Sequence, residues 1–176
     1  MGRTSLVVLD SNCLSYLLDG IYTITGPTGP VADQQIALVR IMLYDEWGLF
    51  VTPTVVDECE RIRNNARAAV HDSWLSTLIT EMQPINSLIV SSRGTQLLQW
   101  HNDPDDCRIV AECEDAGIRV VLTYDRPFIG HLRSRTVVKV LRPTEYWESL
   151  GIPKGSGPQT SPHDTNPLAS LDWWRW

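Results

Sequence analysis

Short apolar runs alternate with stretches of helical periodicity along most of this chain. The runs rich in apolar and β-branched residues predict strands at 5–10, 49–52, 87–90, 119–124 and 136–141. Between them, apolar residues recur at spacings of three and four, as on one face of an amphipathic helix. These stretches predict helices at 12–19, 33–47, 53–66, 68–82, 94–100, 105–115 and 143–150. Strands that alternate with helices indicate an α/β fold of three layers, α/β/α, around a mostly parallel sheet of about five strands.

Local signals fix several boundaries of these elements. Asn12 can cap the first helix, Pro53 fits the first turn of the third, and Gly117 is typical of a helix C-terminus. Glycine and proline in 20–31 predict a loop. We expect one domain over 1–150, followed by a Gly/Pro/Ser-rich tail at 151–176 that is flexible unless it docks. The tail ends in three tryptophans, and protein contact is the role we favour for them: Trp173, Trp174 and Trp176.

Four acidic residues stand where an apolar run ends or where a helix begins: Asp10, Glu58, Asp106 and Asp125. In a parallel sheet, strand ends and the helix starts beyond them gather at one edge, where ligands bind. We therefore expect the four carboxylates to converge. Converging carboxylates repel one another and need a cation, and carboxylate-rich sites suit Mg²⁺ or Mn²⁺. The sequence thus predicts a metal-dependent enzyme.

Each acid also has a simpler interpretation. Asp10 and Asp125 could be turn residues or helix caps, and Glu58 could complement a helix dipole. Glu60 is a rival of Glu58, but residues two apart do not share a helix face. Among the acids at 103–106, Asp106 lies three residues before the core residue Ile109, which favours it over Asp105.

Composition limits the remaining function classes. The chain has 176 residues, 43% of them hydrophobic, which suits one soluble domain. Its net charge of -6 argues against binding nucleic acid through bulk charge, although bound cations would offset an acidic metal site. No apolar run approaches the roughly 18 residues of a membrane span, and no signal-peptide core is visible, so a cytoplasmic protein is expected. The four cysteines have no metal-binding spacing and are expected to be free thiols.

Four segments taken in order resemble the PIN-domain nucleases. They run from Val7 to Leu14, Thr52 to Arg61, Asp105 to Ala111 and Val121 to Phe128. The family pattern is Asp-small-Asn after the first strand, a Glu in the helix after the second, an Asp at a later helix start, and Thr-any-Asp with a nearby Phe. The match covers about 5–150. The loop at 20–31 and the tail after Gly151 depart from a compact family member.

The resemblance implies a metal-dependent endoribonuclease that leaves 5′-phosphate and 3′-hydroxyl ends. One or two Mg²⁺ or Mn²⁺ ions would be held by the four acids, with Asn12, Thr123 and Asp105 orienting ligands or water. Many small bacterial members are toxins. The partners to expect are therefore RNA, an antitoxin or other regulatory protein, and a second copy of the chain.

Basic residues beside the acids are candidates for gripping RNA, although they could also be ordinary solvated surface. One group follows Asp125 and the other lies next to Glu58: Arg126, His131, Arg133 and Arg135, and Arg61 with Arg63 and Arg67. Two alternative functions stay open, a catalytically inactive PIN-fold scaffold or binding module and a DNA or structure-specific nuclease. A dehalogenase-like phosphatase is disfavoured because Asn12 stands where its second Asp belongs. A nucleotide-binding module is disfavoured because no glycine-rich phosphate loop follows a strand.

Overall fold

A single parallel sheet of five strands organises the molecule. The computed structural model describes residues 6–45, 48–77, 79–83 and 86–176. The strands lie in the order β3-β2-β1-β4-β5, and every neighbouring pair is parallel. Their bounds are β1 (Val7–Leu9), β2 (Leu49–Val51), β3 (Thr80–Glu81), β4 (Val120–Leu122) and β5 (Lys139–Leu141). The central strands β1 and β4 are wholly buried, as their continuous apolar sequences predict.

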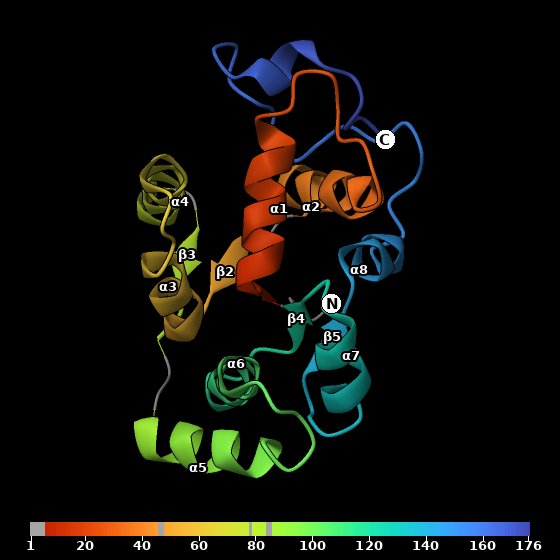
Figure 1. Ribbon diagram of the computed structural model, residues 1–176. Helices are drawn as coiled ribbons and strands as arrows, with labels where there is room; N and C mark the ends of the chain where they lie inside the picture. The colour runs from red at the N-terminus through yellow and green to blue at the C-terminus, as the bar shows by residue number, and fades with distance from the viewer. Residues whose placement is uncertain (1–5, 46–47, 78, 84–85) are drawn as a thin grey trace.

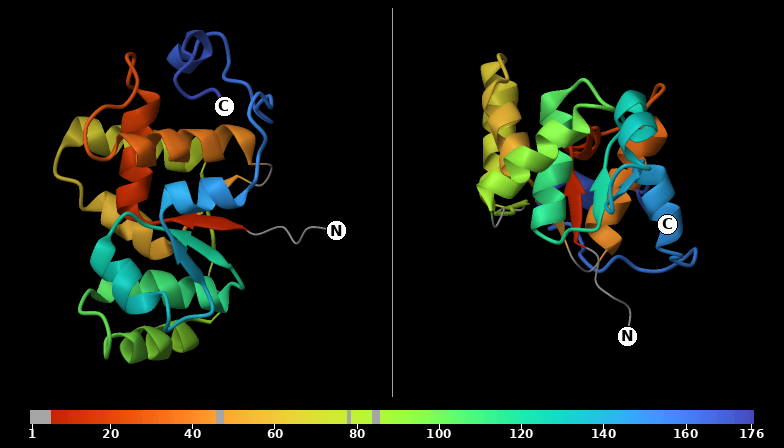
Figure 2. Two further views of the ribbon diagram at one scale, coloured as in Figure 1. Left: turned by 90° about the vertical axis from the view of Figure 1, so that its right-hand side faces the viewer. Right: turned by 90° about the horizontal axis from the view of Figure 1, so that it is seen from below.

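Helices cover both faces of this sheet, which confirms the predicted three-layer α/β/α fold. Helices α1, α2 and α8 lie on one side of the sheet and α5 and α6 on the other (Figures 1 and 2). The bounds are α1 (Ser11–Ile21), α2 (Ala32–Tyr44), α3 (Pro53–Glu60), α4 (Asn65–Thr77), α5 (Ser87–Leu97), α6 (Pro104–Asp115), α7 (Arg126–Leu132) and α8 (Pro143–Ser149).

The direction of winding reverses between β1 and β4. The chain adds β2 and then β3 on one side of β1, and later adds β4 and β5 on the other side. In open parallel sheets, a crevice forms beyond the carboxyl ends of the two strands where the direction reverses, and this crevice is the usual ligand site. The fold therefore favours a ligand site at the carboxyl ends of β1 and β4, directly after Leu9 and Leu122.

The third strand is the main error of the sequence interpretation. The apolar run at 87–90 belongs to α5, because the Asn86 side chain caps that helix by accepting from the Leu88 and Ile89 amides. Both of these side chains are exposed rather than buried in a sheet. The strand lies instead at Thr80–Glu81, where a helix was expected. A short apolar run does not distinguish strand from helix, and a two-residue edge strand leaves almost no pattern.

Other boundaries also differ. The expected helix at 53–66 ends at Glu60, and α4 begins at Asn65. Helix α7, a short helix capped by Asp125, was not expected. Asp10, not Asn12, caps α1. The parts of the predictions that concern Ser5, Glu46, Trp47 and Leu78 lie outside the described residues.

The tail after Gly151 packs against the domain. Trp174 is buried at 1% exposure and its indole N–H donates to the Leu168 carbonyl. Arg40 of α2 donates to the Trp174 carbonyl, and the Trp176 amide donates to the Tyr44 hydroxyl. The only regular element among these residues is a 3₁₀ turn at Pro167–Ser170. The tail is thus docked by its aromatic end.

The glycine-rich loop and the tail contact each other. Gly26 has a φ of 82°, and a Cβ built there would lie 3.1 Å from the Trp173 ring. The two segments that depart from a compact family member therefore pack together.

Among the described residues, no helix has the length and apolarity that a membrane crossing needs.

Candidate metal centre

The sheet brings Asp10 and Asp125 to its reversal point. Asp10 directly follows β1, and its amide donates to the Leu122 carbonyl of β4 at 3.0 Å. Thr123 lies between the two acids and is wholly buried. Its side chain hydrogen-bonds Asp10, and its Oγ1 accepts from the Asp125 amide at 3.0 Å. Thr123 therefore links the carboxylate of Asp10 to the backbone of Asp125.

Asp10 is a buried acid that still caps a helix. The Cys13 amide donates to its Oδ1 at 2.6 Å, and the side chain is only 3% exposed. Burial raises the pKa of Asp10 to about 6, against the hydrogen bonds from Thr123 and Cys13 that lower it, and the charge of Asp125 adds to the rise. Capping and ligation are compatible here, because the reported cap bond uses only one carboxylate oxygen.

Glu58 reaches the same place from the second turn of α3. Burial raises its pKa to about 7, and the charges of Asp105 and Asp10 raise it further, whereas a hydrogen bond from Ser11 and the charge of Arg61 lower it. Its sequence rival Glu60 is exposed. The structure thus places Glu58, and not the exposed Glu60 two positions later, near the Asp10 carboxylate.

Asp106 comes from the first turn of α6, and its neighbour Asp103 provides the cap. The Asp103 carboxylate accepts from the amides of Asp105 and Asp106 at 2.9 and 3.4 Å. Burial raises the pKa of Asp106 to about 8, and four nearby carboxylates contribute to the rise: Asp103, Asp10, Asp125 and Glu58. These interactions show that the four predicted acids share one electrostatic environment.

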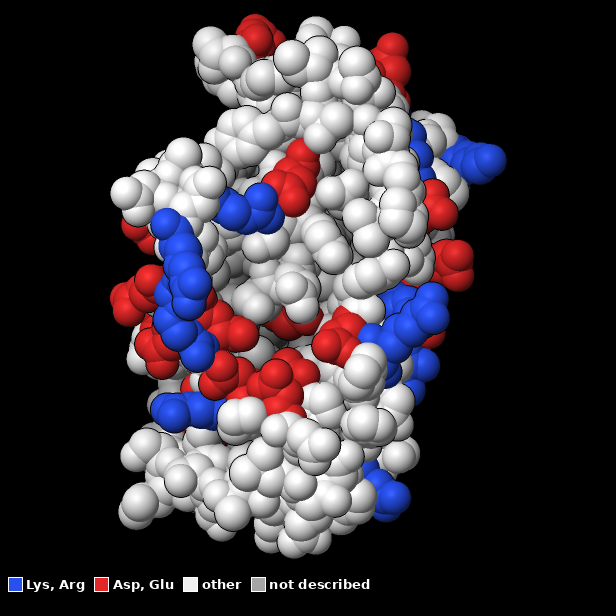
Figure 3. All heavy atoms as spheres, viewed as in Figure 1, with Lys and Arg blue, Asp and Glu red and all other residues white. Residues whose placement is uncertain are grey.

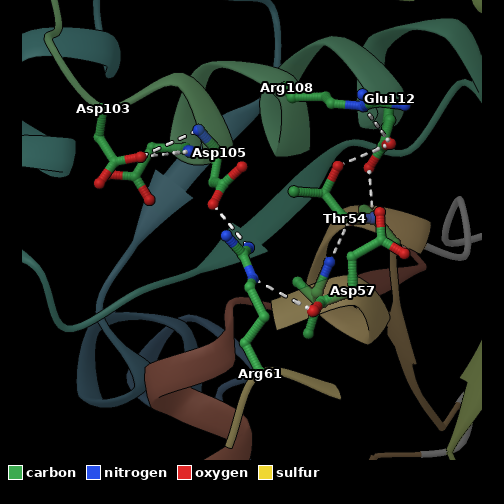
Figure 4. Close-up of polar contacts among 10 residues, drawn as sticks. Thr54, Asp57, Arg61, Asp103, Asp105, Arg108 and Glu112 are labelled. Atoms are coloured by element: carbon green, nitrogen blue, oxygen red, sulfur yellow. Dashed lines mark hydrogen bonds and ion pairs between the residues drawn. The ribbon is translucent and has the colours of Figure 1, made fainter. Parts of the chain in front are cut away.

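Asp105 is paired with an arginine and bridges two helices. It accepts from Arg61 at 2.7 Å, and Arg61 also donates to the Asp57 carbonyl of α3 (Figure 4). Asn12 lies exposed in the first turn of α1. Of the three residues expected to support the site, Thr123 is therefore the one that holds acids directly.

The sequence interpretation missed His101, which contacts Asp106. Its Nε2 lies 2.6 Å from Asp106 Oδ2, and its Nδ1 lies 3.1 Å from His131 Nδ1. Burial and the charge of His131 lower the pKa of His101, whereas the charges of Asp103 and Asp125 raise it. These residues line a pocket of about 390 Å³ that also includes Asp125. The only sequence signal was a histidine five residues before Asp106.

Most of the expected rim arginines already have partners. Arg133 donates to Glu145 at 2.6 Å and to the Val140 carbonyl, and Arg135 stacks over the Trp100 ring at 5.3 Å. Arg61 is paired with Asp105. Within the described part of the chain, exposed Arg126 has no ion-pair partner. Exposed Arg63 likewise has none among these residues, and Arg126 is the one of the two directly beside Asp125.

The oxygen-rich donor set fits a hard divalent ion. Acidic side chains gather around a hollow in this face of the molecule (Figure 3). Among the described residues, no Lys or Arg forms an ion pair with the four central acids. Within the same residues, no three acidic, His or Cys side chains already surround one point closely enough to hold an ion. Mg²⁺ commonly keeps several waters and uses one or two carboxylates, so a pre-formed cage is not required.

Comparison with known proteins shows the fold. No family model matches the sequence, and no match was found among curated proteins. The structure is similar to VapBC2 from Rickettsia felis bound to a promoter DNA fragment, with a TM-score of 0.51 and 9% identity over 78% of this chain and 98% of that chain. FitAcB from Neisseria gonorrhoeae gives 0.49 and 15%, covering 78% and 98%. PAE2754 from Pyrobaculum aerophilum gives 0.49 and 14%, covering 84% and 97%. The likeness to VapBC2 shows a PIN-like α/β fold. Any activity has to be argued from the residues of the site.

Proposed function

We propose that the protein is a Mg²⁺- or Mn²⁺-dependent endoribonuclease. The observation that carries the proposal is the set of four acids at the reversal point of the sheet, electrostatically coupled and without a Lys or Arg partner among the described residues. Uncompensated acids in one cleft are costly for a fold and are typical of functional sites. Asp10, Glu58, Asp106 and Asp125 would hold the ion.

The residues of the chain would divide the work as follows. A divalent ion supplies positive charge against the phosphodiester and lowers the pKa of water. Thr123 holds the carboxylate of Asp10 and the backbone of Asp125, so these two ligands need little reorganisation. His101 fixes one oxygen of Asp106. Arg126, beside Asp125, would orient a phosphate of the RNA chain.

The test is an incubation of single-stranded and structured RNA with the protein in Mn²⁺ or in EDTA. We expect the wild type to give cleavage products with Mn²⁺ but not with EDTA. We expect no products from Asp10→Asn or Glu58→Gln in either condition. Asn also caps helices well, so Asp10→Asn keeps α1. Glu60→Gln is the matched control, because it removes an exposed acid from the same helix and should cleave normally.

Each result has a clear meaning. Cleavage in EDTA, or unchanged cleavage by both site variants, contradicts a metal enzyme built on these acids. RNA binding without any cleavage in Mn²⁺ favours the inactive scaffold. Cleavage of DNA with RNA left intact favours a DNA nuclease, because the metal chemistry does not distinguish the sugars.

We further propose that the protein is the toxin of a toxin–antitoxin pair. The support is the PIN-like fold shared with VapBC2. Induced expression should arrest growth of a bacterial host, and Asp10→Asn should not. Equal arrest by both forms would contradict a toxicity that depends on the acids.

A further inference from the structure

Two tyrosines stand at the edge of the acidic centre without joining it. Tyr16 is on α1, six residues after Asp10, and Tyr124 lies between Thr123 and Asp125. Both side chains are partly exposed, whereas neighbouring Leu17 and Leu122 are fully buried. The Tyr16 ring contacts the ring of Tyr124, and burial, Tyr124 and, to a smaller extent, the charge of Asp10 raise the pKa of the Tyr16 hydroxyl. The pair therefore lies beside Thr123 and Asp125.

The two rings hold each other in a fixed geometry. Their centroids lie 5.6 Å apart, and their planes are inclined by 81°, an edge-to-face contact. Such a contact covers one face of one ring, so a partly exposed pair keeps aromatic surface for a third ring. The two rings come from different elements, and a base bound there would touch both α1 and the junction between β4 and α7.

The charges around the cleft limit how RNA could be gripped. Arg61, Arg67 and Arg133 each form an ion pair with a carboxylate of the chain, at 2.7, 3.1 and 2.6 Å. The net charge is -6. Phosphate contacts by lysine and arginine normally dominate affinity for nucleic acid. With these cations already balanced, a contribution that does not depend on charge would strengthen binding.

We propose that Tyr16 and Tyr124 form a stacking platform for one unpaired nucleobase beside the phosphodiester at the acidic centre. The inference rests on the proposed ribonuclease function and adds the residues of this chain that would hold one base of the substrate. A base inside a duplex is stacked on both faces and cannot reach the platform, whereas an unpaired base stacks readily on aromatic side chains.

The test measures binding of an RNA oligonucleotide that carries 2-aminopurine, single-stranded or annealed to its complement. An Asp10→Asn background with Mg²⁺ present prevents cleavage during the measurement. Tyr16→Leu and Tyr124→Leu remove the ring but keep apolar bulk, whereas Tyr16→Phe and Tyr124→Phe keep the ring. Tyr22→Leu is the control, because Tyr22 is an exposed tyrosine at the other end of α1. Arg126→Ala reports the ionic part of binding.

We expect each Leu variant to bind the single-stranded probe about 10-fold more weakly, in line with base–aromatic stacking. In the Leu variants, the quenching of 2-aminopurine fluorescence by stacking on the tyrosine rings should also be lost. The Phe variants and the Tyr22 control should match the parent, and duplex binding should not change. Arg126→Ala should weaken both probes alike and flatten the salt dependence.

Unchanged binding of the single strand by both Leu variants overturns the inference, and so does an equal loss for both probes. If wild type still cleaves RNA in Mn²⁺ in either case, the proposed function stands without the platform. If wild type neither binds nor cleaves RNA, both proposals fall.

Discussion

Two acids on the same helix have opposite surroundings. Asp106 and Glu112 lie six residues apart on α6, and both side chains are largely buried, with 18% and 1% exposed. Glu112 accepts from the Thr54 amide at 3.3 Å, from the Thr54 hydroxyl at 2.8 Å and from Arg108 at 3.3 Å (Figure 4). Among the described residues, the Asp106 side chain has a single hydrogen bond, with His101, and its other neighbours include four carboxylates.

The difference distinguishes Glu112, which stabilises the fold through its hydrogen bonds, from Asp106, which belongs to the candidate metal centre. A buried carboxylate is tolerable where donors replace the water it has lost, as they do at Glu112. Asp106 gains some help from the N-terminus of α6, but the surrounding charges oppose its ionisation. A fold that keeps such an arrangement gives up stability for function. Glu112 joins α6 to α3, whereas Asp106 lacks such donors and would be available to the proposed cation.

The largest expected effect separates the two acids by activity. Asp106→Asn should lower kcat/KM for RNA by more than about 100-fold, because losing a ligand exceeds the roughly 10–100-fold effect of losing an outer partner. Glu112→Gln should cleave normally at a temperature where it is folded. Initial rates on a short RNA with Mn²⁺ measure both. Equal losses would remove the distinction between site and scaffold.

The next effect concerns stability. Glu112→Gln replaces an accepting oxygen with an amide NH₂, so a buried donor of Thr54 loses its partner. We expect the free energy of unfolding to fall by about 1–3 kcal/mol. Urea denaturation measures it, and Glu148→Gln, which changes an exposed glutamate of α8, should leave the midpoint in place. A neutral Glu112→Gln would mean that the bridge from α3 to α6 adds nothing.

The sequence predicts the site better than it predicts what supports it. Asp10 and Asp125 follow apolar runs, and strand topology alone makes them neighbours. Glu112 looks like any polar helix residue, because its partner Thr54 is 58 positions away. His101 is missed for a similar reason, since a hydrogen bond to Asp106 has no periodic signature. The tail is harder still, because its docking depends on contacts such as Trp173 against Gly26.

A smaller effect should appear as a dependence of stability on pH. Burial raises the pKa of Glu58 to about 7 and that of Asp106 to about 8 in the folded chain, against 4.5 and 3.8 for the free groups. The folded state therefore binds more protons than the unfolded state between these values, and the metal-free protein loses stability as pH rises. From pH 7 to pH 8 we expect a loss on the order of 1 kcal/mol. Urea unfolding in EDTA measures it, and Mg²⁺ should reduce the loss.

The smallest effect tests whether the fall in stability with pH comes from Asp106 or from Glu112. Asp106→Asn removes the acid with the highest of these pKa values, so in EDTA it should flatten the decline between pH 7 and pH 8 and leave the protein more stable at pH 8. Glu112→Gln should lower stability by a similar amount at both pH values, because hydrogen-bond donors already compensate the charge of Glu112. A variant that inactivates the enzyme would then stabilise the metal-free fold, while one that keeps activity would weaken it. If the slope followed Glu112 instead, the uncompensated charge would lie in the bridge between α3 and α6, and the case for a cation at Asp106 would fail.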